Sequence, residues 1–314
     1  MTHFLSFVWN PSEGIQIGSF TLRFYSLMFV VAFALGWYLM APIFKRENEP
    51  QEKLDSLFVY MVISILLGAR LGHVLFYQSD LILKDPLSVI LPFRFVPEFK
   101  FTGFQGLASH GAAITVIVAM YLYKTRILKR SYLWILDRIV IPVASGAIFV
   151  RLGNFFNSEI YGPVTSGDNF YAVKFIRDDE FWADKSVEQI TGTKDLNQAY
   201  DLIQTNPSFT DVLNQIPFRH PAQLYEAFGY VFVFSLLLYM YWKTDARKKE
   251  GLLFGTFLVT LFSIRILVES VKESQGGFET MKMFSLLTTG QWLSIPFVIA
   301  GIYLIFKAKD KTTT

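Results

Sequence analysis

The sequence predicts an all-α polytopic membrane protein of about seven transmembrane helices with a small extracytoplasmic α+β cap. Of its 314 residues, 52% are hydrophobic and only 18% are charged, whereas about a quarter of the residues of a soluble domain are charged. The apolar residues gather in seven stretches that are long enough, or nearly so, to cross a hydrocarbon core of about 30 Å. Lysine and arginine then cluster in alternate connections between these stretches.

The expected helices, in chain order, are Phe20–Phe44, Leu54–Tyr77, Leu107–Tyr123, Tyr132–Val150, Ala222–Trp242, Leu252–Val271 and Trp292–Phe306. The first nineteen residues contain no lysine or arginine. Because a cleavable signal peptide begins with a basic region, we expect Phe20–Phe44 to be a retained helix. Leu107–Tyr123 is short and has glycine-rich flanks, so six helices with one buried or interfacial segment remain an alternative.

Basic residues in the connections predict the orientation. They gather after the first, third, fifth and seventh stretches, at Lys45/Arg46/Lys53, Lys124/Arg126/Lys129/Arg130, Lys243/Arg247/Lys248/Lys249 and Lys307/Lys309/Lys311. Cytoplasmic loops carry an excess of lysine and arginine. We therefore expect the N-terminus outside the cell and the C-terminus in the cytoplasm.

One long polar insertion, residues 161–219, separates the fourth and fifth helices. It divides the chain into helices 1–4 over 1–160, a cap over 161–219, and helices 5–7 with a cytoplasmic tail over 220–314, all within one membrane domain. The insertion contains a helix-compatible stretch, Leu196–Thr205, and an alternating run, Phe170–Ile176, that favours a strand. We expect a small cap of mixed structure outside the membrane.

Composition excludes several chemistries. There is no cysteine, which excludes disulfides, thiolate metal sites and an enzyme-borne cysteine nucleophile. The four histidines have no metal-ligand spacing, and the chain lacks the Gly-x-Ser-x-Gly, His-Glu-x-x-His, P-loop and Gly-x-Gly-x-x-Gly motifs. We expect no metal and no cofactor, and the net charge of +3 gives no reason to expect a nucleic-acid partner.

Polar groups inside the predicted helices indicate function, because ionisable side chains are costly in hydrocarbon. With a rise of 1.5 Å per residue, Arg70 lies roughly 24 Å and Arg265 roughly 21 Å from the cytoplasmic start of its helix. Arg151 lies near the outer end of the fourth helix, and Tyr25, His110 and His220 lie near outer helix starts. Six helices thus bring a polar group to the outer half of the bilayer.

The richest segment runs from Gly146 to Gly162. In a helix, Arg151, Asn154 and Asn157 form one stripe, and Glu159 follows. A guanidinium beside amides suits an anionic headgroup, which arginine binds in bidentate fashion. The alternative is a buried polar network that only ties helices together.

Three other segments carry candidates, each with a structural alternative. Gln223 and Glu226 share one face of the fifth helix, and Glu226 is otherwise an acid near a positive helix end. Arg265 and Glu269 stand at i, i+4 and otherwise form a self-neutralising ion pair. His110 has small neighbours that permit close backbone approach, and it is otherwise a structural histidine.

These segments together resemble the bacterial prolipoprotein diacylglyceryl transferase family. The resemblance rests on Arg23-Phe-Tyr25, Gly68-Ala-Arg70-Leu-Gly72, Ser109-His110-Gly111, Arg151-Leu-Gly-Asn154-Phe-Phe-Asn157-Ser-Glu159-x-x-Gly162, Arg219-His220-Pro-Ala-Gln223-Leu-Tyr225-Glu226, Arg265-x-x-x-Glu269 and Gly290-Gln291. They occur in order along nearly the whole chain. The departures are Ala112 for a glycine, a longer insertion at Pro163–Pro217, and Val271-Lys-Glu-Ser where the family often has Phe-Arg-x-Pro.

The resemblance implies transfer of a diacylglyceryl group from phosphatidylglycerol to the lipobox cysteine of a prolipoprotein signal peptide, in the bacterial cytoplasmic (inner) membrane. The nucleophilic thiol then belongs to the substrate, which fits an enzyme without cysteine. The residues implied as catalytic are His110, Arg151 and Arg265. Those implied as substrate-binding are Tyr25, Arg70, Asn154, Asn157, Glu159, Gly162, His220, Gln223, Tyr225, Glu226 and Glu269. His110 is a candidate base, with a structural hydrogen-bonding role as its alternative.

A second class of function is a transporter of an anionic solute or lipid, with Arg70, Arg151 and Arg265 as binding groups. Transporters often show inverted repeats and broken midplane helices, and neither is evident in the sequence. A purely structural membrane scaffold is a third class, against which the cost of so many buried charges argues.

Overall fold

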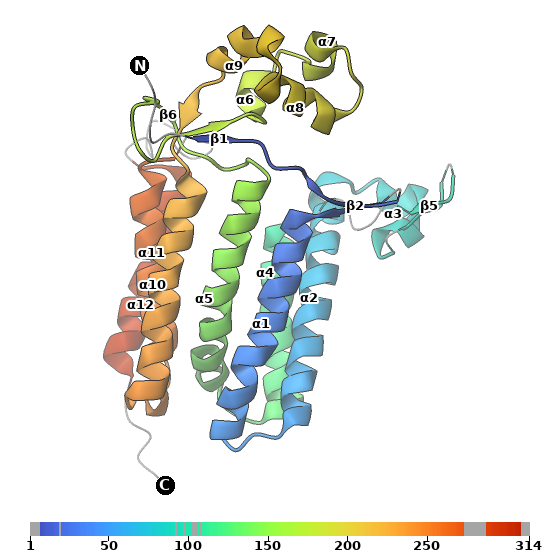
Figure 1. The fold of residues 1–314 in the computed structure, drawn as a ribbon. Coiled ribbons are helices and arrows are strands. Elements are labelled where there is room, and N and C mark those ends of the chain that lie inside the picture. The colour runs from blue at the N-terminus through green and yellow to red at the C-terminus, as the bar shows by residue number, and fades with distance from the viewer. Residues whose placement is uncertain are drawn as a thin grey trace. The chain divides into compact units, whose positions relative to one another are not determined.

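The computed structural model describes residues 7–18, 20–91, 93–96, 98–101, 106, 108–272 and 287–308. In this part of the chain, seven helices are long and apolar enough to cross a membrane. They are α1 (Phe24–Arg46), α2 (Gln51–Tyr77), α4 (Ser109–Tyr123, continued by the π-helical turn η2, Lys124–Leu128), α5 (Tyr132–Phe156), α10 (Ala222–Lys243), α11 (Leu252–Glu269) and α12 (Thr289–Lys307) (Figure 1). The predicted multi-pass helical fold is confirmed.

Helix boundaries differ from the prediction at two informative points. Phe20–Arg23 is not the start of α1 but strand β3, which pairs antiparallel with β2 (Gly14–Ile17). At the other point α5 continues beyond the predicted end at Val150 to Phe156. Arg151 and Asn154 therefore lie in its last two turns.

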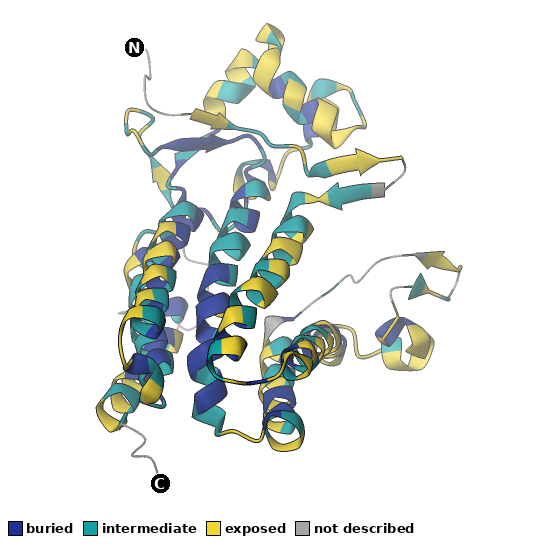
Figure 2. Cartoon of the chain, turned by 60° about the horizontal axis from the view of Figure 1, so that its bottom comes forward, coloured by how far each residue is buried: buried dark blue, intermediate teal, exposed yellow. Residues whose placement is uncertain are grey.

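The surface of the helices is apolar, as expected where lipid is the solvent. Phe76 of α2 is 70% exposed, Phe228 of α10 is 81% exposed and Phe306 of α12 is 86% exposed. Figure 2 shows exposed residues along the helices. A water-soluble protein does not usually present large exposed apolar patches. The exposed faces therefore agree with membrane-spanning helices.

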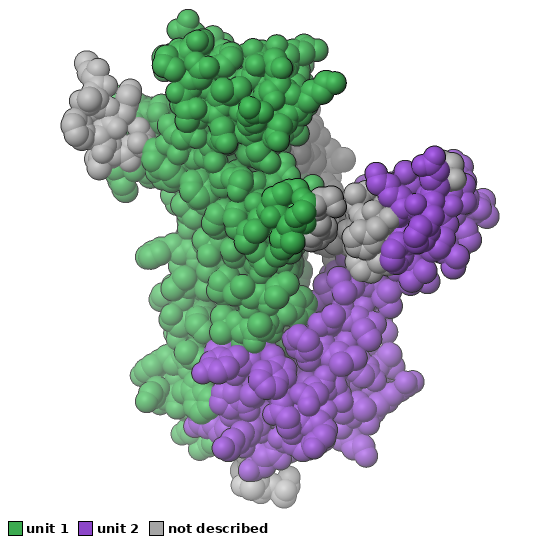
Figure 3. All heavy atoms as spheres, turned by 45° about the vertical axis from the view of Figure 1, so that its right-hand side comes forward, with its two compact units in different colours: residues 1–36, 137–314 green, residues 37–136 purple. Residues whose placement is uncertain are grey.

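The chain divides into two compact units, residues 1–36 with 137–314 and residues 37–136 (Figure 3). In the first unit α10 packs against α11, and α11 packs against α12. Asp137 of α5 is fully buried, and its carboxylate accepts hydrogen bonds from the backbone N–H groups of Gly251 (2.7 Å) and Phe254 (2.8 Å). An acidic side chain at a helix N-terminus is favourable, so Asp137 fixes the start of α11 against α5.

The cap belongs to the same unit. Its four-stranded sheet has the order β1-β7-β8-β6, with β1 (Phe7–Trp9) parallel to β7 (Val173–Phe175), and β8 (Phe218–Arg219) antiparallel to both β7 and β6 (Val164–Thr165). Between β7 and β8 the chain forms short helices: α6 (Asp179–Trp182), α7 (Val187–Thr191), α8 (Leu196–Thr205), η3 (Pro207–Phe209) and α9 (Thr210–Gln215). The helix predicted at Leu196–Thr205 is α8, and the predicted strand is present but shorter.

The cap has its own apolar core and a buried ionic anchor. Trp182, Ala199 and Ile203 pack together in the core. Arg219, at the end of β8, forms ion pairs with Asp178 (2.5 Å) and Glu180 (2.7 Å). Burial lowers the pKa of Arg219, but the hydrogen bonds and charges of these two carboxylates outweigh it and raise that pKa. Arg219 therefore stays charged and holds the cap together one residue before His220.

The second unit is built on α2 and α4, with α3 (Leu81–Lys84), η1 (Pro86–Val89), β4 (Phe93–Arg94) and β5 (Lys100–Phe101). Gly72 of α2 faces Gly111 of α4 so closely that a Cβ on Gly72 would lie 2.6 Å from the Cα of Gly111. Small residues allow membrane helices to approach in this way. The hydroxyl of Thr115 also donates to the carbonyl of Ser64 at 2.7 Å, which satisfies a polar group at the crossing.

Candidate active site

An ion pair between two helices lies at the centre of the candidate site. Nε of Arg151, on α5, lies 2.5 Å from Oε2 of Glu226, on α10. Glu226 is fully buried, and the side chain of Arg151 is 14% exposed. A buried charge is costly unless it is paired, so each residue requires the other.

The polar stripe of α5 continues this pair. Nη1 of Arg151 donates to Oδ1 of Asn154 at 3.0 Å, and Nδ2 of Asn154 donates to Oε1 of Glu159 at 2.7 Å. The hydroxyl of Tyr25, on α1, is a further hydrogen-bond partner of Asn154. Asn157 lies just beyond the helix end, with Nδ2 at 3.5 Å from Oε1 of Glu159. The predicted stripe is confirmed as a geometric arrangement up to Asn154, and Asn157 joins it from the following turn.

The backbone after α5 has an unusual conformation. Ser158 and Ile160 both have positive φ, 54° and 60°, which is uncommon for any residue with a Cβ and a genuine outlier for a β-branched one. Such outliers persist only where the surroundings over-determine them, often at functional sites. Gly162 follows, and a Cβ there would collide with the carbonyl oxygen of Val271 and with Cβ of His220. The segment is thus held tightly against the end of α11 and the start of α10.

The start of α10 supports this segment. The fully buried Gln223 donates from Nε2 to the carbonyl oxygen of Glu159 at 2.6 Å. Nδ1 of His220 lies 3.2 Å from the hydroxyl of Tyr225, and the His220 ring stacks on Tyr171 at 4.8 Å. Burial lowers the pKa of His220, which favours the neutral imidazole.

The cap adds negative potential beside Glu159. Burial, and then the neighbouring charges of Asp178 and Glu159, raise the pKa of Asp179. A carboxyl group responds in this way when it approaches other carboxylates. Asp178, Asp179 and Glu159 therefore form an acidic group beside the end of α5.

The end of α11 contributes Lys272 and Glu269. Nζ of Lys272 lies 3.2 Å from Oε1 of Glu226 and 3.5 Å from Oε2 of Glu269. The carboxylate of Glu269 also lies against Gly290, in the first turn of α12. In the described part of the chain the carboxylate of Glu269 faces Nζ of Lys272, and no ion pair joins it to Arg265. Arg265 is half-buried and acts electrostatically on Tyr230, which also hydrogen-bonds to Arg151.

We call the joined side chains the Arg151 cluster: Tyr25, Arg151, Asn154, Glu159, Glu226 and Lys272. Six further candidates from the sequence lie around the cluster, and we call them its supporting residues: Asn157, Gly162, His220, Gln223, Tyr225 and Glu269. Sequence analysis missed Lys272, which is a member of the cluster, and Tyr230, which hydrogen-bonds to Arg151. The one signal for Lys272 was that a basic residue directly follows the last turn of a membrane helix.

Arg70 and His110 belong to the unit of residues 37–136 and are described within it. Arg70 is buried, and its Nη2 donates to the carbonyl oxygen of Ser88 at 2.7 Å. His110 is the second residue of α4 and is exposed. Their predicted roles beside Arg151 stay predictions.

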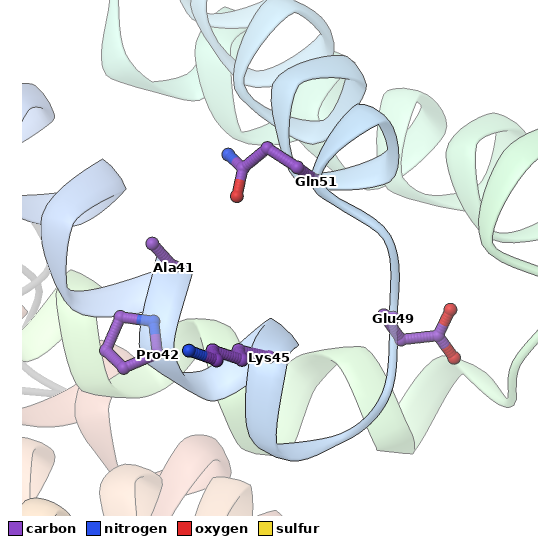
Figure 4. A pocket seen from close by; sticks show the side chains of 5 residues that line it. All are labelled: Ala41, Pro42, Lys45, Glu49 and Gln51. Carbon is purple, nitrogen blue, oxygen red and sulfur yellow. The ribbon is translucent and has the colours of Figure 1, made fainter.

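The same unit contains a cavity of ≈ 430 Å³ near the end of α1, lined by Ala41, Pro42, Lys45, Glu49 and Gln51 (Figure 4). The Glu49 side chain is only 3% exposed and pairs with Lys53 and Arg130, each at 2.7 Å. Its carboxylate is therefore occupied by partners within the protein. Across the described ranges there is no group of three or more His, Asp or Glu side chains that could hold a metal ion.

Comparison with known proteins decides the family. Residues 13–307 match the family model described as prolipoprotein diacylglyceryl transferase. The chain belongs to this family. The phosphatidylglycerol–prolipoprotein diacylglyceryl transferase of Chloroherpeton thalassium is 36% identical over 301 residues, which are 96% of this chain and 93% of that protein. The enzymes of the same name from Tolumonas auensis (36% identical, 96% and 98% covered) and Bacteroides fragilis (34% identical, 96% and 95% covered) are similar over comparable lengths.

Membership of the transferase family agrees with the resemblance that the motifs indicated. The family model and these relatives name a transferase, not a transporter. The transporter alternative therefore has no support. The Arg151 cluster lies entirely within the matched range.

Proposed function

We propose that the chain transfers the diacylglyceryl group of phosphatidylglycerol to the lipobox cysteine thiol of prolipoproteins, the first step of lipoprotein maturation. In this reaction the thiol sulfur bonds to the glyceryl carbon that carried the phosphate. The C–O bond to that phosphate breaks, glycerol phosphate leaves with the electron pair, and the thiol proton passes to a base. The observation that carries the proposal is the ion pair of Arg151 with the buried Glu226, in which the guanidinium also donates to the amide of Asn154, in a chain of this family.

Arg151 is suited to bind the phosphate of the donor lipid. Its guanidinium is planar and always charged, and it binds phosphate oxygens through two parallel N–H groups. Glu226 fixes one edge of the guanidinium at Nε, while Nη1 faces the amide of Asn154. A cation held at this point stabilises the negative charge that develops on the leaving phosphate. Arg265, half-buried in α11, is proposed as a second cation for the same charge.

Substrate-binding roles are proposed for the other residues of the cluster and for its supporting residues. His110 is proposed as the base. A free thiol has a pKa of about 8.5, so only a few per cent of it is ionised at neutral pH. A base or a positive field is therefore needed. The donor is phosphatidylglycerol, and the acceptor is a prolipoprotein signal peptide presented from the outer face of the bacterial cytoplasmic membrane.

A direct assay tests the proposal. The purified chain is incubated with phosphatidylglycerol and a synthetic lipobox peptide, and the peptide mass is followed. We expect a gain equal to one diacylglyceryl group on the cysteine, with glycerol phosphate released in equal amount. A peptide with serine in place of cysteine is the control and should stay unchanged. An unchanged cysteine peptide in the presence of folded protein would reject the proposed function.

A further inference from the structure

Lys272 is the second cation of the Arg151 cluster and lies beside the two acids that the sequence places on separate helices. Its side chain is 8% exposed, and its Nζ approaches Oε1 of Glu226 and Oε2 of Glu269 at 3.2 and 3.5 Å. The other oxygen of Glu226 is the one that faces Nε of Arg151. Each carboxylate oxygen of Glu226 therefore has its own cation, Arg151 on one side and Lys272 on the other.

The pairing of Glu226 with Lys272 affects which contacts Arg151 makes. Glu226 is fully buried, and a buried carboxylate is stable only when it is paired and hydrogen-bonded. If Lys272 were neutral, Oε1 of Glu226 would lose its cation, and the guanidinium of Arg151, which already faces Oε2, would be drawn toward it. A bidentate Arg151–Glu226 contact would then compete with Asn154, and with any phosphate, for the N–H groups of Arg151.

The charge balance leads to the same conclusion. Arg151, Lys272, Glu226 and Glu269 carry two positive and two negative charges. Without Lys272, the remaining Arg151, Glu226 and Glu269 have one positive and two negative charges, at the point where an anionic phosphate is proposed to bind. Like charges in a poorly solvated site repel strongly, so the affinity for the donor lipid should fall.

We propose that Lys272 is a positioning residue for Arg151: by pairing with Oε1 of Glu226, it keeps the N–H groups of Arg151 that face neither Glu226 nor Asn154 available to the phosphate of an anionic phospholipid. The proposal rests on the proposed function, because it assumes that Arg151 binds the donor phosphate. Lys272 itself is not assigned a contact with the reacting atoms.

The test compares Lys272→Met, Lys272→Arg and wild type in the peptide transfer assay. We expect Lys272→Met to raise KM for phosphatidylglycerol roughly tenfold or more, because an unpaired charge remains in the site. Lys272→Arg keeps the cation and should stay within about threefold of wild type. Lys248→Met, which breaks the exposed pair of Lys248 with Asp245 at 2.6 Å, is the matched control and should behave as wild type.

A readout that does not depend on turnover accompanies the kinetics. Phosphatidylglycerol in mixed micelles should raise the melting temperature of wild type and of Lys272→Arg, and this rise should be much smaller for Lys272→Met. A Lys272→Met protein with a lower melting temperature but an unchanged KM would show that Lys272 only ties α11 to α10, and would overturn the proposal.

The double variant Lys272→Met/Glu226→Gln covers the case in which Lys272→Met does not fold. The Glu226→Gln substitution makes this side chain neutral. The loss of Lys272 then leaves no negative charge at position 226 that would pair with Arg151 instead. The double variant should therefore match Glu226→Gln alone within about threefold in KM. If the increases in KM caused by the two single substitutions multiply in the double variant, Lys272 acts independently of Glu226. A wild type that neither transfers lipid nor is stabilised by phosphatidylglycerol would reject the proposed function, and the inference with it.

Discussion

At the scale of single residues, Arg151 has partners on two edges of its guanidinium, Glu226 at Nε and Asn154 at Nη1. Lysine carries the same charge but cannot reproduce this planar, two-sided contact. We predict that Arg151→Lys loses roughly a hundredfold or more in kcat/KM for phosphatidylglycerol, while the protein still inserts and folds. The transfer assay and thermal unfolding in detergent measure the two properties.

The matched control is Arg177→Lys, in the cap. Arg177 is also partly buried and faces an acid, Glu13, at 3.8 Å, but it lies outside the Arg151 cluster. It should retain normal turnover. If Arg151→Lys lowered the melting temperature and spared turnover, Arg151 would be a tie between helices, and our site assignment would be wrong.

His110 is tested separately. Glutamine retains hydrogen-bonding capacity but cannot accept a proton at neutral pH. If His110 takes the thiol proton, His110→Gln should reduce kcat by about a hundredfold or more. Near-normal turnover of the glutamine variant would exclude proton abstraction by this histidine and favour its structural alternative.

At the scale of elements, the turn between α1 and α2 depends on a buried acid. Burial alone would raise the pKa of Glu49, but hydrogen bonds from Lys53 and Arg130 outweigh it and lower that pKa. A lowered carboxyl pKa stabilises the fold above the unfolded value, about 4.3, and this stabilisation is lost as the pH falls through the folded value. Glu49→Gln should therefore lower the free energy of unfolding by about 1.5–3 kcal/mol at pH 7.

The pH dependence checks this assignment. The difference in melting temperature between wild type and Glu49→Gln should be largest above pH 5 and should shrink as the pH falls below about 4. Transfer activity should be the same for both proteins. A difference that stays constant down to low pH would show that the charge of Glu49 contributes nothing to stability.

The elements also show what the sequence could predict. Leu196–Thr205 was predictable because its determinants are local: Asp195 caps the helix by accepting from the backbone N–H of Gln198, and Ala199 and Ile203 face the cap core. The start of α1 could not be predicted, because the sequence of Phe20–Arg23 suits a helix as well as a strand. Pairing with Gly14–Ile17 decides it.

The candidate site shows the same contrast. The contact of Arg151 with Asn154 spans three residues within α5, so helical periodicity could predict it. The contact of Asn154 with Glu159 spans five residues and depends on the turn after the helix, which periodicity does not specify. Lys272 and Glu226 are separated by 46 residues, and no spacing rule joins them. Their pairing depends on how α10 and α11 pack, which the sequence alone does not specify.

At the scale of the whole molecule, the orientation in the membrane stays a prediction that rests on the basic clusters. Reporter fusions at Lys129 and Lys248 should read cytoplasmic, and a fusion near Asp195 in the cap should read external. These three positions lie in loops or at helix ends in the structure, so fusions there should disturb packing least. A cytoplasmic reading at Asp195 would contradict the predicted topology.

The central claim is that the Arg151 cluster binds the anionic headgroup of the donor lipid. The most direct measurement is the rate of peptide modification by the purified chain in membranes whose donor is either phosphatidylglycerol or zwitterionic phosphatidylethanolamine with the same acyl chains. We predict modification with phosphatidylglycerol and none above background with phosphatidylethanolamine, because only the former presents an uncompensated phosphate to Arg151. Equal rates with the two lipids would contradict it, since headgroup charge would then not be what the cluster recognises.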